Sequence, residues 1–157
     1  MTHPDVDEHF KARMDSSAKA EATIAAALKR AGYWVSLSPE HDGDGAYADI
    51  YVRTESGKTI AQVEVKSRNL QFHSPETFPY PDAALVTKNR HKEWRDYVIY
   101  STVTQLAIVS ARGAVRLPKT QADNSRGVAG TVFSAPREAL ITWKGYLWLL
   151  KERANER

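Results

Sequence analysis

The chain has 157 residues, 42% of them apolar, a formal net charge of +3 and no cysteine. This length suits one domain with a substantial core, and no apolar run is long enough to span a membrane. The absence of cysteine excludes disulfides, thiolate metal sites and a cysteine nucleophile. The first residues lack the pattern of a secretory signal, so we expect a cytoplasmic protein.

The N-terminal third begins with a polar segment and continues with an alanine-rich one. We expect a flexible N-terminal arm over residues 1–15 and a helix over residues 18–31, because alanine has the highest helix propensity. Asp15, Ser16 or Ser17 would cap the start of this helix, and Gly32 would follow its end.

Glu21 lies on the apolar stripe of the predicted helix, together with Ile24, Ala25 and Leu28. A carboxylate on a stripe that faces the core is costly unless it has a partner. Glu21 therefore lies either at the margin of the stripe, where the helix dipole favours it, or beside a bound cation.

A strand over residues 33–37 and a loop over residues 39–45 are predicted next. The loop contains His41, Asp42 and Asp44, which are metal ligands by type but also ordinary turn residues. We favour the turn interpretation for these three residues.

Two strands, over residues 46–53 and 60–66, are predicted to form a hairpin through the polar, glycine-containing turn 54–58. Arg53 would then lie opposite Thr59, which brings Asp49 close to Val63 or Glu64. Glu64 and Lys66 share one face of their strand because side chains alternate. Neighbouring carboxylates repel unless a cation lies between them, and hard oxygen ligands suit Mg²⁺ or Mn²⁺.

The rest of the chain begins with a long connection over residues 67–82, rich in proline and aromatic residues and typical of a functional loop. We then predict a buried strand at 83–87, followed at 88–97 by a helix, or by a turn and then a helix. Strands are predicted at 104–110 and 114–117. A mobile loop at 119–130 leads to a further strand at 131–133. Residues 137–150 form a strand or a docking segment containing Trp143, Tyr146 and Trp148, for which we favour core packing. Residues 151–157 read as a charged tail.

Basic side chains gather in one segment, at Lys88, Arg90, Lys92 and Arg95, with His91 among them. Such a run is typical either of a surface that binds nucleic acid or of an ordinary solvated helix face. The pI of about 9.1 is compatible with a polyanionic partner.

The order of these elements resembles the PD-(D/E)XK nuclease superfamily, the restriction-endonuclease-like fold. Ala48-Asp49 matches the PD element, with alanine replacing proline, and Glu64-Val65-Lys66 matches the (D/E)XK element. The similarity covers roughly residues 16–110. It implies an α/β protein with an αβββαβ core, a central mixed sheet flanked by helices, and a single domain over residues 16–150. The loop after the lysine also resembles that of small phage-encoded nucleases, which implies a bacterial or phage-infected host cell.

The resemblance implies a metal-dependent nuclease that hydrolyses DNA phosphodiester bonds. Asp49, Glu64 and the Val65 carbonyl would hold Mg²⁺ or Mn²⁺ with help from Glu21, and Lys66 would hold the attacking water. The expected partner is DNA, with RNA left open, no membrane, and a possible second copy of the chain as a homodimer. The residues that would contact nucleic acid are Gln62, Ser67, Arg68, Asn69, Lys88, Arg90, His91 and Lys92.

Two other interpretations stay open. In the first, the chain is a non-catalytic module that binds nucleic acid or protein on the same fold. In the second, it is an adaptor that uses its C-terminal aromatic residues as an interface. Lys66 also has an ordinary alternative, a surface ion pair with Glu64 worth under about 1 kcal/mol. Catalysis is favoured because a binding protein gains nothing from clustered acids that face DNA.

Overall fold

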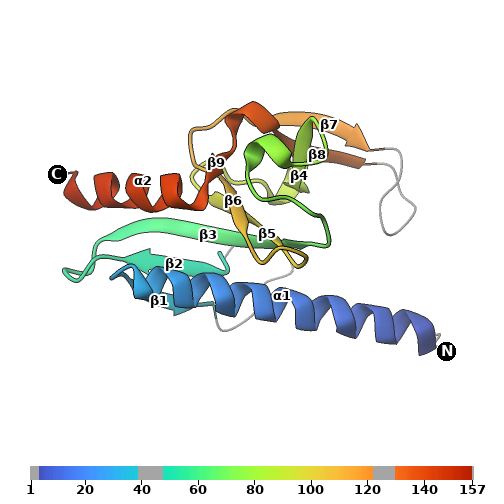
Figure 1. Ribbon diagram of the computed structural model, residues 1–157, viewed down its shortest axis with the longest axis horizontal. Helices are drawn as coiled ribbons and strands as arrows, with labels where there is room; N and C mark the ends of the chain where they lie inside the picture. Colours follow the sequence, from blue (N-terminus) through green and yellow to red (C-terminus); the bar gives the residue numbers. More distant parts are fainter. Residues whose placement is uncertain (1–3, 39–47, 122–129, 157) are drawn as a thin grey trace.

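The computed structural model describes residues 4–38, 48–121 and 130–156. The large sheet comprises β1 (Trp34–Leu37), β2 (Ile50–Arg53), β3 (Thr59–Arg68), β5 (Asp96–Ser101), β6 (Ala107–Ser110) and β9 (Ile141–Thr142). The small sheet comprises β4 (Asp82–Thr87), β8 (Gly130–Pro136) and β7 (Leu117–Gln121), and the helices are α1 (Pro4–Arg30) and α2 (Trp143–Asn155). In Figure 1, β3 runs between the two helices, and the small sheet lies at the upper right.

The first helix is longer than the sequence indicated. α1 begins at Pro4, so the start expected at residues 15–17 is wrong, and residues 4–15 are helical. Proline suits the first turn of a helix, because its fixed φ is helical and its missing N–H needs no partner there. The capping residues at 15–17 are therefore accommodated inside the helix.

The first three strands form an antiparallel meander, of which the hairpin of β2 and β3 was predicted. Arg53 lies opposite Thr59 and Ile50 opposite Val63, so the register expected for the hairpin is confirmed. Gly57, at φ +93°, supplies the left-handed backbone that the turn requires. This register fixes which β3 residues lie level with the start of β2.

The connection from β3 to β5 departs from the expected core. β5 pairs with β3 in parallel, but residues 69–95 contain two 3-10 helices, η1 (Pro75–Thr77) and η2 (Lys88–Arg90), and β4 instead of an α-helix. The helix predicted at 88–97 is therefore wrong. All six side chains of β5 are buried. Aromatic and β-branched residues, such as those of β5, are favoured in a central strand because they pack well on both of its faces.

Two hydrophobic clusters cover the two faces of the large sheet. The first contains Val63, Val65, Val98 and Val109 of the sheet, Ala20, Ile24 and Leu28 of α1, and Tyr146 and Leu150 of α2. The second contains Tyr97, Ile99 and Ile108 of the sheet with Phe72, Leu85 and Ala135 from the loop and the small sheet. Full burial of each valine, isoleucine, leucine or phenylalanine side chain contributes on the order of 1.5–3 kcal/mol, so both helices and the small sheet are held by the same central strands.

The small sheet was not expected as a separate layer. The strand predicted at 83–87 is confirmed as β4, yet it pairs with β8 and not with the large sheet. The strand predicted at 131–133 lies within β8, and the one predicted at 114–117 begins later, as β7 at Leu117. The strand predicted at 104–110 is shorter and begins at Ala107. The described residues thus form a mixed α/β fold, with a mixed central sheet and two α-helices.

From Trp143 to Asn155 the C-terminal segment is helical, against the prediction of a strand or a docking segment followed by a charged tail. The Thr142 hydroxyl accepts a hydrogen bond from the Gly145 N–H at 3.0 Å and caps α2. Tyr146 and Leu150 are buried four residues apart, as one face of a helix requires. Core packing is therefore correct for Tyr146, but Trp148 is 65% exposed. Residues 151–155 belong to α2.

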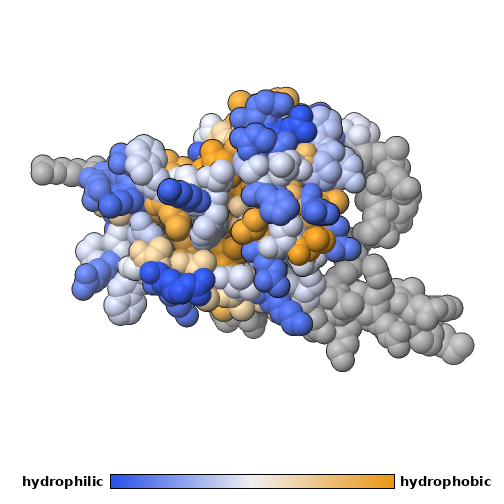
Figure 2. Space-filling view, in the orientation of Figure 1, coloured by the Kyte–Doolittle hydropathy of each residue, from blue (hydrophilic) through white to orange (hydrophobic). Residues whose placement is uncertain are grey.

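Figure 2 shows hydrophobic surface in the middle of the molecule over β3, with hydrophilic side chains around it. Within the described residues, neither helix carries an apolar stretch long enough to cross a bilayer. His41, Asp42 and Asp44 of the predicted loop lie outside the described residues, as does most of the loop predicted at 119–130.

Candidate functional site

The start of β2 brings Asp49 to the middle of β3. Asp49 directly precedes β2, and its carboxylate oxygen Oδ2 accepts a hydrogen bond of 2.9 Å from the Val65 backbone N–H. Ile50 lies opposite Val63, one step further along the ladder. The two strands therefore place Asp49 beside the Glu64-Val65 segment, as the hairpin register predicted.

Glu64 and Lys66 form an ion pair on β3. The Lys66 Nζ lies 3.1 Å from Glu64 Oε2, and the two side chains are only 24% and 14% exposed. With Gln62 and Arg68 they share one face of β3, because side chains alternate along a strand. We call these four residues the β3 stripe. On β5, Tyr97 lies level with Glu64, and Ile99 lies level with Lys66.

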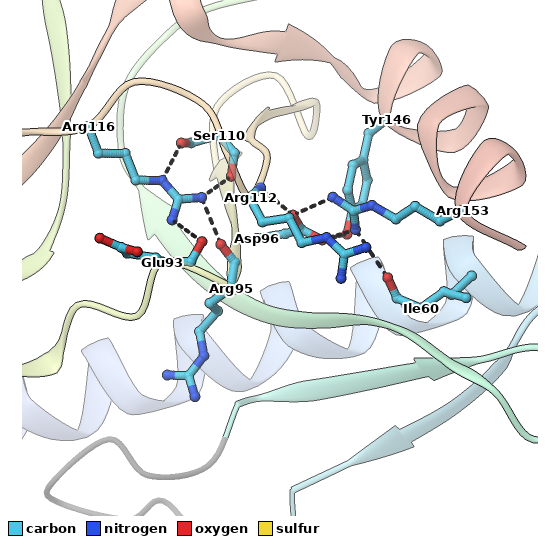
Figure 3. Close-up of polar contacts among 9 residues, drawn as sticks. All are labelled: Ile60, Glu93, Arg95, Asp96, Ser110, Arg112, Arg116, Tyr146 and Arg153. Atoms are coloured by element: carbon cyan, nitrogen blue, oxygen red, sulfur yellow. Dashed lines mark hydrogen bonds and ion pairs between the residues drawn. The ribbon is translucent and has the colours of Figure 1, made fainter. Parts of the chain in front are cut away.

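Arg95 supplies a second cation to Glu64. Its Nη1 lies 3.7 Å from Glu64 Oε1, and the residue is fully buried. Figure 3 shows its side chain pointing away from Arg116 and from the carboxylate of Asp96. In the sequence Arg95 belongs to a basic run expected at the surface, but it directly precedes the buried strand β5 and is itself buried, whereas Lys88 and Arg90 are exposed.

Two polar clusters hold the backbone on either side of Arg95. In the first, Arg116 donates hydrogen bonds to the carbonyl oxygens of Arg95 at 2.7 Å and of Ser110 at 2.9 Å. Burial lowers the pKa of Arg116, but five contacts with carbonyl and hydroxyl oxygens still hold its guanidinium. Figure 3 shows those to Glu93, Arg95 and Ser110. This cluster ties the turn at residues 92–95 to β6.

The second cluster surrounds Asp96, which is fully buried. Its carboxylate accepts hydrogen bonds from Arg153 at 2.6 and 3.0 Å and from the Tyr146 hydroxyl at 2.7 Å. Burial, reinforced by the charge of Asp96, raises the pKa of Tyr146 well above its ordinary value. Burial alone would lower the pKa of Arg153, but hydrogen bonds and attraction to Asp96 outweigh it and raise the pKa. Neighbouring residues 95 and 96 thus face opposite sides of the sheet.

The donor set near Asp49 fits a hard divalent cation in part. Asp49 and Glu64 offer carboxylate oxygens, the ligand type that Mg²⁺ and Mn²⁺ prefer. Glu64 Oε2 is buried, and no donor among the described residues reaches it with hydrogen-bond geometry, although Lys66 Nζ lies beside it. A buried acceptor needs a partner, and a metal ion at Glu64 Oε2 would share this oxygen with the Lys66 ammonium.

Glu21 does not complete this set. It lies half-buried on α1, between buried Ala20 and Ile24. Among the described residues, no three histidine, aspartate or glutamate side chains come together closely enough to hold one metal ion. The structure thus brings Asp49 to the Glu64-Val65 segment, but it does not gather all three predicted carboxylates around one point.

A polar cleft opens at the far end of the β3 stripe. Its volume is about 520 Å³, and Lys66, Arg68, Asn69 and Ser67 line it together with Ser16 and Ser17 of α1 and Thr102. The Ser16 and Ser67 hydroxyls lie 3.0 Å apart, and the Thr102 hydroxyl donates to Asn69 Oδ1 at 3.1 Å. Three residues predicted to contact nucleic acid, Ser67, Arg68 and Asn69, therefore line one cleft with Lys66.

The predicted basic segment divides into exposed and packed residues. Lys88 and Arg90 are exposed on η2, and Lys92 Nζ lies over the Trp94 ring, 5.9 Å from its centroid. His91 instead stacks on Phe133, with ring centroids 4.0 Å apart, and near Tyr97 at 6.0 Å. His91 lies near Tyr97, and Tyr97 lies level with Glu64, so the basic segment borders the part of the stripe that contains Glu64. Arg68 lies about 13 Å from Glu64 along β3, at about 3.3 Å per residue.

The fold and site thus define a mixed α/β protein whose central strand carries a half-buried acid–lysine pair between a basic segment and a polar cleft. No protein-family model matches the chain, and no curated protein sequence matches it.

Proposed function

We propose that this protein is a metal-dependent nuclease that hydrolyses DNA phosphodiester bonds, on a restriction-endonuclease-like core. The meander of β1, β2 and β3 after a helix, followed by the parallel strand β5, supports this proposal. The observation that carries it is the contact of Asp49 with the Val65 N–H, beside the Glu64–Lys66 ion pair. The missing crossover helix is a departure from the core.

In this proposal Asp49, Glu64 and the Val65 carbonyl hold Mg²⁺ or Mn²⁺. When bound, the ion supplies Lewis acidity to a phosphate oxygen and lowers the pKa of a water molecule. Lys66, on the cleft side of Glu64, would orient the attacking water and offset negative charge that develops on the phosphate. Arg95, buried behind Glu64 at 3.7 Å, fixes the direction of that carboxylate. Glu21 is not one of the metal ligands in this proposal.

Nucleic acid would run along the β3 stripe. Exposed Lys88 and Arg90 lie towards its Glu64 end, while Arg68 and Asn69 lie in the cleft at its other end. Cations at both ends would hold the sugar–phosphate backbone over Glu64 and Lys66, because phosphate contacts dominate the affinity for DNA.

The test is incubation of single-stranded, plasmid and linear duplex DNA with Mg²⁺, Mn²⁺ or EDTA. We expect cleavage with either metal, none in EDTA, and losses of at least about 100-fold for Asp49→Asn and Lys66→Met, since each removes a charged group that acts in the transition state. Glu55→Gln and Lys29→Gln are matched controls, because both are exposed and lie outside the site. Cleavage that persists in both site variants rejects the proposal.

A second candidate is a nucleic-acid-binding module without catalysis. Two observations favour it. Glu64 is already flanked by Lys66 and Arg95, and the described residues contain no group of three metal-ligating side chains. A wild-type protein that binds DNA in a salt-dependent manner but cuts no nucleic acid with any metal would establish this alternative.

A further inference from the structure

A second cavity lies beside the polar cleft and has a different chemistry. Its volume is about 380 Å³, within the range of small-ligand sites. Leu70, Phe78, Tyr80 and Ile99 give it apolar walls, and Arg68 and Asp82 line it as well. It lies between the loop that follows β3 and the start of β4.

Tyr80 is the accessible aromatic residue of this cavity. It is 53% exposed, whereas Phe78 is 4% exposed. The Tyr80 ring meets the Phe78 ring edge-on, with centroids 6.1 Å apart and an interplanar angle of 72°. Phe78 in turn packs on Phe72 at 5.5 Å. Phe72 and Phe78 thus belong to the core cluster and form a fixed base that supports an exposed ring.

The loop that carries these aromatic residues is held in place by side chains from other segments. Thr104 donates its hydroxyl to the Phe72 carbonyl at 2.7 Å, and Ser101 donates to the Leu70 carbonyl at 2.5 Å. Arg137 donates to the Phe78 carbonyl at 3.2 Å. Because the cavity is formed before any ligand arrives, binding would cost little ordering entropy.

Arg68 joins the two cavities, since it lines both the apolar cavity and the polar cleft. Lys66 and several hydroxyl groups lie on one side of it, and Tyr80 and Phe78 lie on the other. A cationic groove that adjoins an aromatic platform is the combination that recognises single strands, with phosphate in the groove and a base on the ring. In a duplex the bases are stacked inside and do not reach such a ring.

We propose that the protein binds single-stranded DNA, with a backbone phosphate in the polar cleft beside Lys66 and Arg68 and an unpaired base on Tyr80 in the adjoining cavity. This inference rests on the proposed function for the choice of a DNA ligand. It adds that the strand presented to Lys66 is unpaired, so single-stranded DNA, overhangs and loops are preferred to blunt duplex.

The experiment measures fluorescence anisotropy of labelled oligonucleotides in EDTA, so that binding is read without cleavage. The probes are a single strand, the same strand with one abasic position moved along it, and the blunt duplex. The variants are Tyr80→Ala, Tyr80→Phe and Arg68→Gln. Trp148→Ala is the matched control, because Trp148 is similarly exposed but lies on α2.

We expect the single strand to bind at least about tenfold more tightly than the duplex. Tyr80→Ala should weaken single-strand binding about 5- to 150-fold, the range of one base–aromatic stack. Tyr80→Phe should bind within about twofold of wild type, because phenylalanine also stacks, and Trp148→Ala should bind like wild type. Arg68→Gln should weaken binding to the intact strand and reduce its salt dependence.

Equal affinity for single strand and duplex, or unchanged binding by Tyr80→Ala, overturns the inference. The abasic probe tests it on the wild-type protein alone: one position should lose affinity as Tyr80→Ala does, and no loss at any position also overturns it. Failure of the proposed function is distinguishable, because it appears as absent cleavage with Mg²⁺ or Mn²⁺ while Tyr80-dependent binding in EDTA persists.

Discussion

The guanidinium of Arg153 contacts both carboxylate oxygens of Asp96, at 2.6 Å and 3.0 Å, inside the protein. Arg153 is 4% exposed and Asp96 is fully buried. The same guanidinium donates to the Ile60 carbonyl at 3.2 Å. One side chain of α2 therefore neutralises a buried charge and joins β3 to β5.

Removing Arg153 should destabilise the protein strongly. Arg153→Ala leaves Asp96 buried without its counter-ion, and breaking such a pair costs about 3–5 kcal/mol. Urea unfolding of Arg153→Ala beside Lys151→Ala, an exposed change on the same helix, measures the difference in unfolding free energy. A loss under about 1 kcal/mol in Arg153→Ala would show that Asp96 does not depend on this partner.

Arg116 should control the turn that carries Arg95. Arg116→Met removes the hydrogen bonds to the carbonyls of residues 92, 93, 95 and 110, and loss of such a buried network costs about 2–4 kcal/mol. Hydrogen exchange at residues 92–97 should accelerate in this variant. Arg112→Met is the control, because its side chain is exposed. Hydrogen exchange at the wild-type rate would show that Arg116 does not hold this turn.

Stability should fall as the pH falls through the range where histidine titrates. Burial lowers the pKa of His91, and Arg116 lowers it further, while Glu93 acts in the opposite direction. The unfolded chain therefore takes up a proton near pH 6.5 that the folded chain resists, so stability present above that pH is lost below it. Thermal unfolding between pH 7.5 and 5 should show this loss in wild type and a smaller one in His91→Phe.

The His91→Phe comparison isolates one residue, because phenylalanine keeps the stack on Phe133 without a titrating nitrogen. His73→Phe, at an exposed position, is the matched control and should retain the wild-type pH profile. Identical profiles for His91→Phe and wild type would assign the acid sensitivity to other groups.

Divalent cations should stabilise the folded protein through Asp49. A ligand bound only by the folded state adds about 2.7 kcal/mol at a hundred times its Kd. The temperature of thermal unfolding should therefore rise with Mg²⁺ or Mn²⁺ and return to its original value with EDTA. Asp49→Asn should lose the shift, since asparagine keeps an oxygen acceptor for the Val65 N–H but not the charge. An equal shift in Asp49→Asn would place any metal elsewhere.

Lys88 and Arg90 should contribute affinity for DNA that does not depend on its base sequence. If each contacts one phosphate, the double variant Lys88→Gln/Arg90→Gln should reduce the slope of log K against log salt by about 1.4 for a single strand. Lys29→Gln, exposed at the end of α1, should leave the slope unchanged. A wild-type slope in the double variant would exclude η2 from the interface.

The hairpin was predictable because its signals are local. The polar turn at 54–58 with Gly57, and alternation on either side, fixed the register that places Arg53 opposite Thr59. That register is also what brings Asp49 to the middle of β3. Here propensity, pattern and turn chemistry all favour the same structure.

The errors arose where distant contacts override local composition. Asp96 and Arg95 made the start of β5 look like part of a charged helix, but their partners Arg153 and Glu64 lie far away in the chain. Arg153 looked like part of a charged tail for the same reason. Long charged side chains read as surface until a buried counter-ion is known.

The buried carboxylate of Asp96 also sets an order for folding. Its partner Arg153 is 57 residues further along the chain. While the protein is being synthesised, β3 and β5 emerge from the ribosome before α2, at a stage when closing the central sheet would enclose an unneutralised charge. Asp96 can thus be enclosed together with its counter-ion only once Arg153 of α2 has been synthesised.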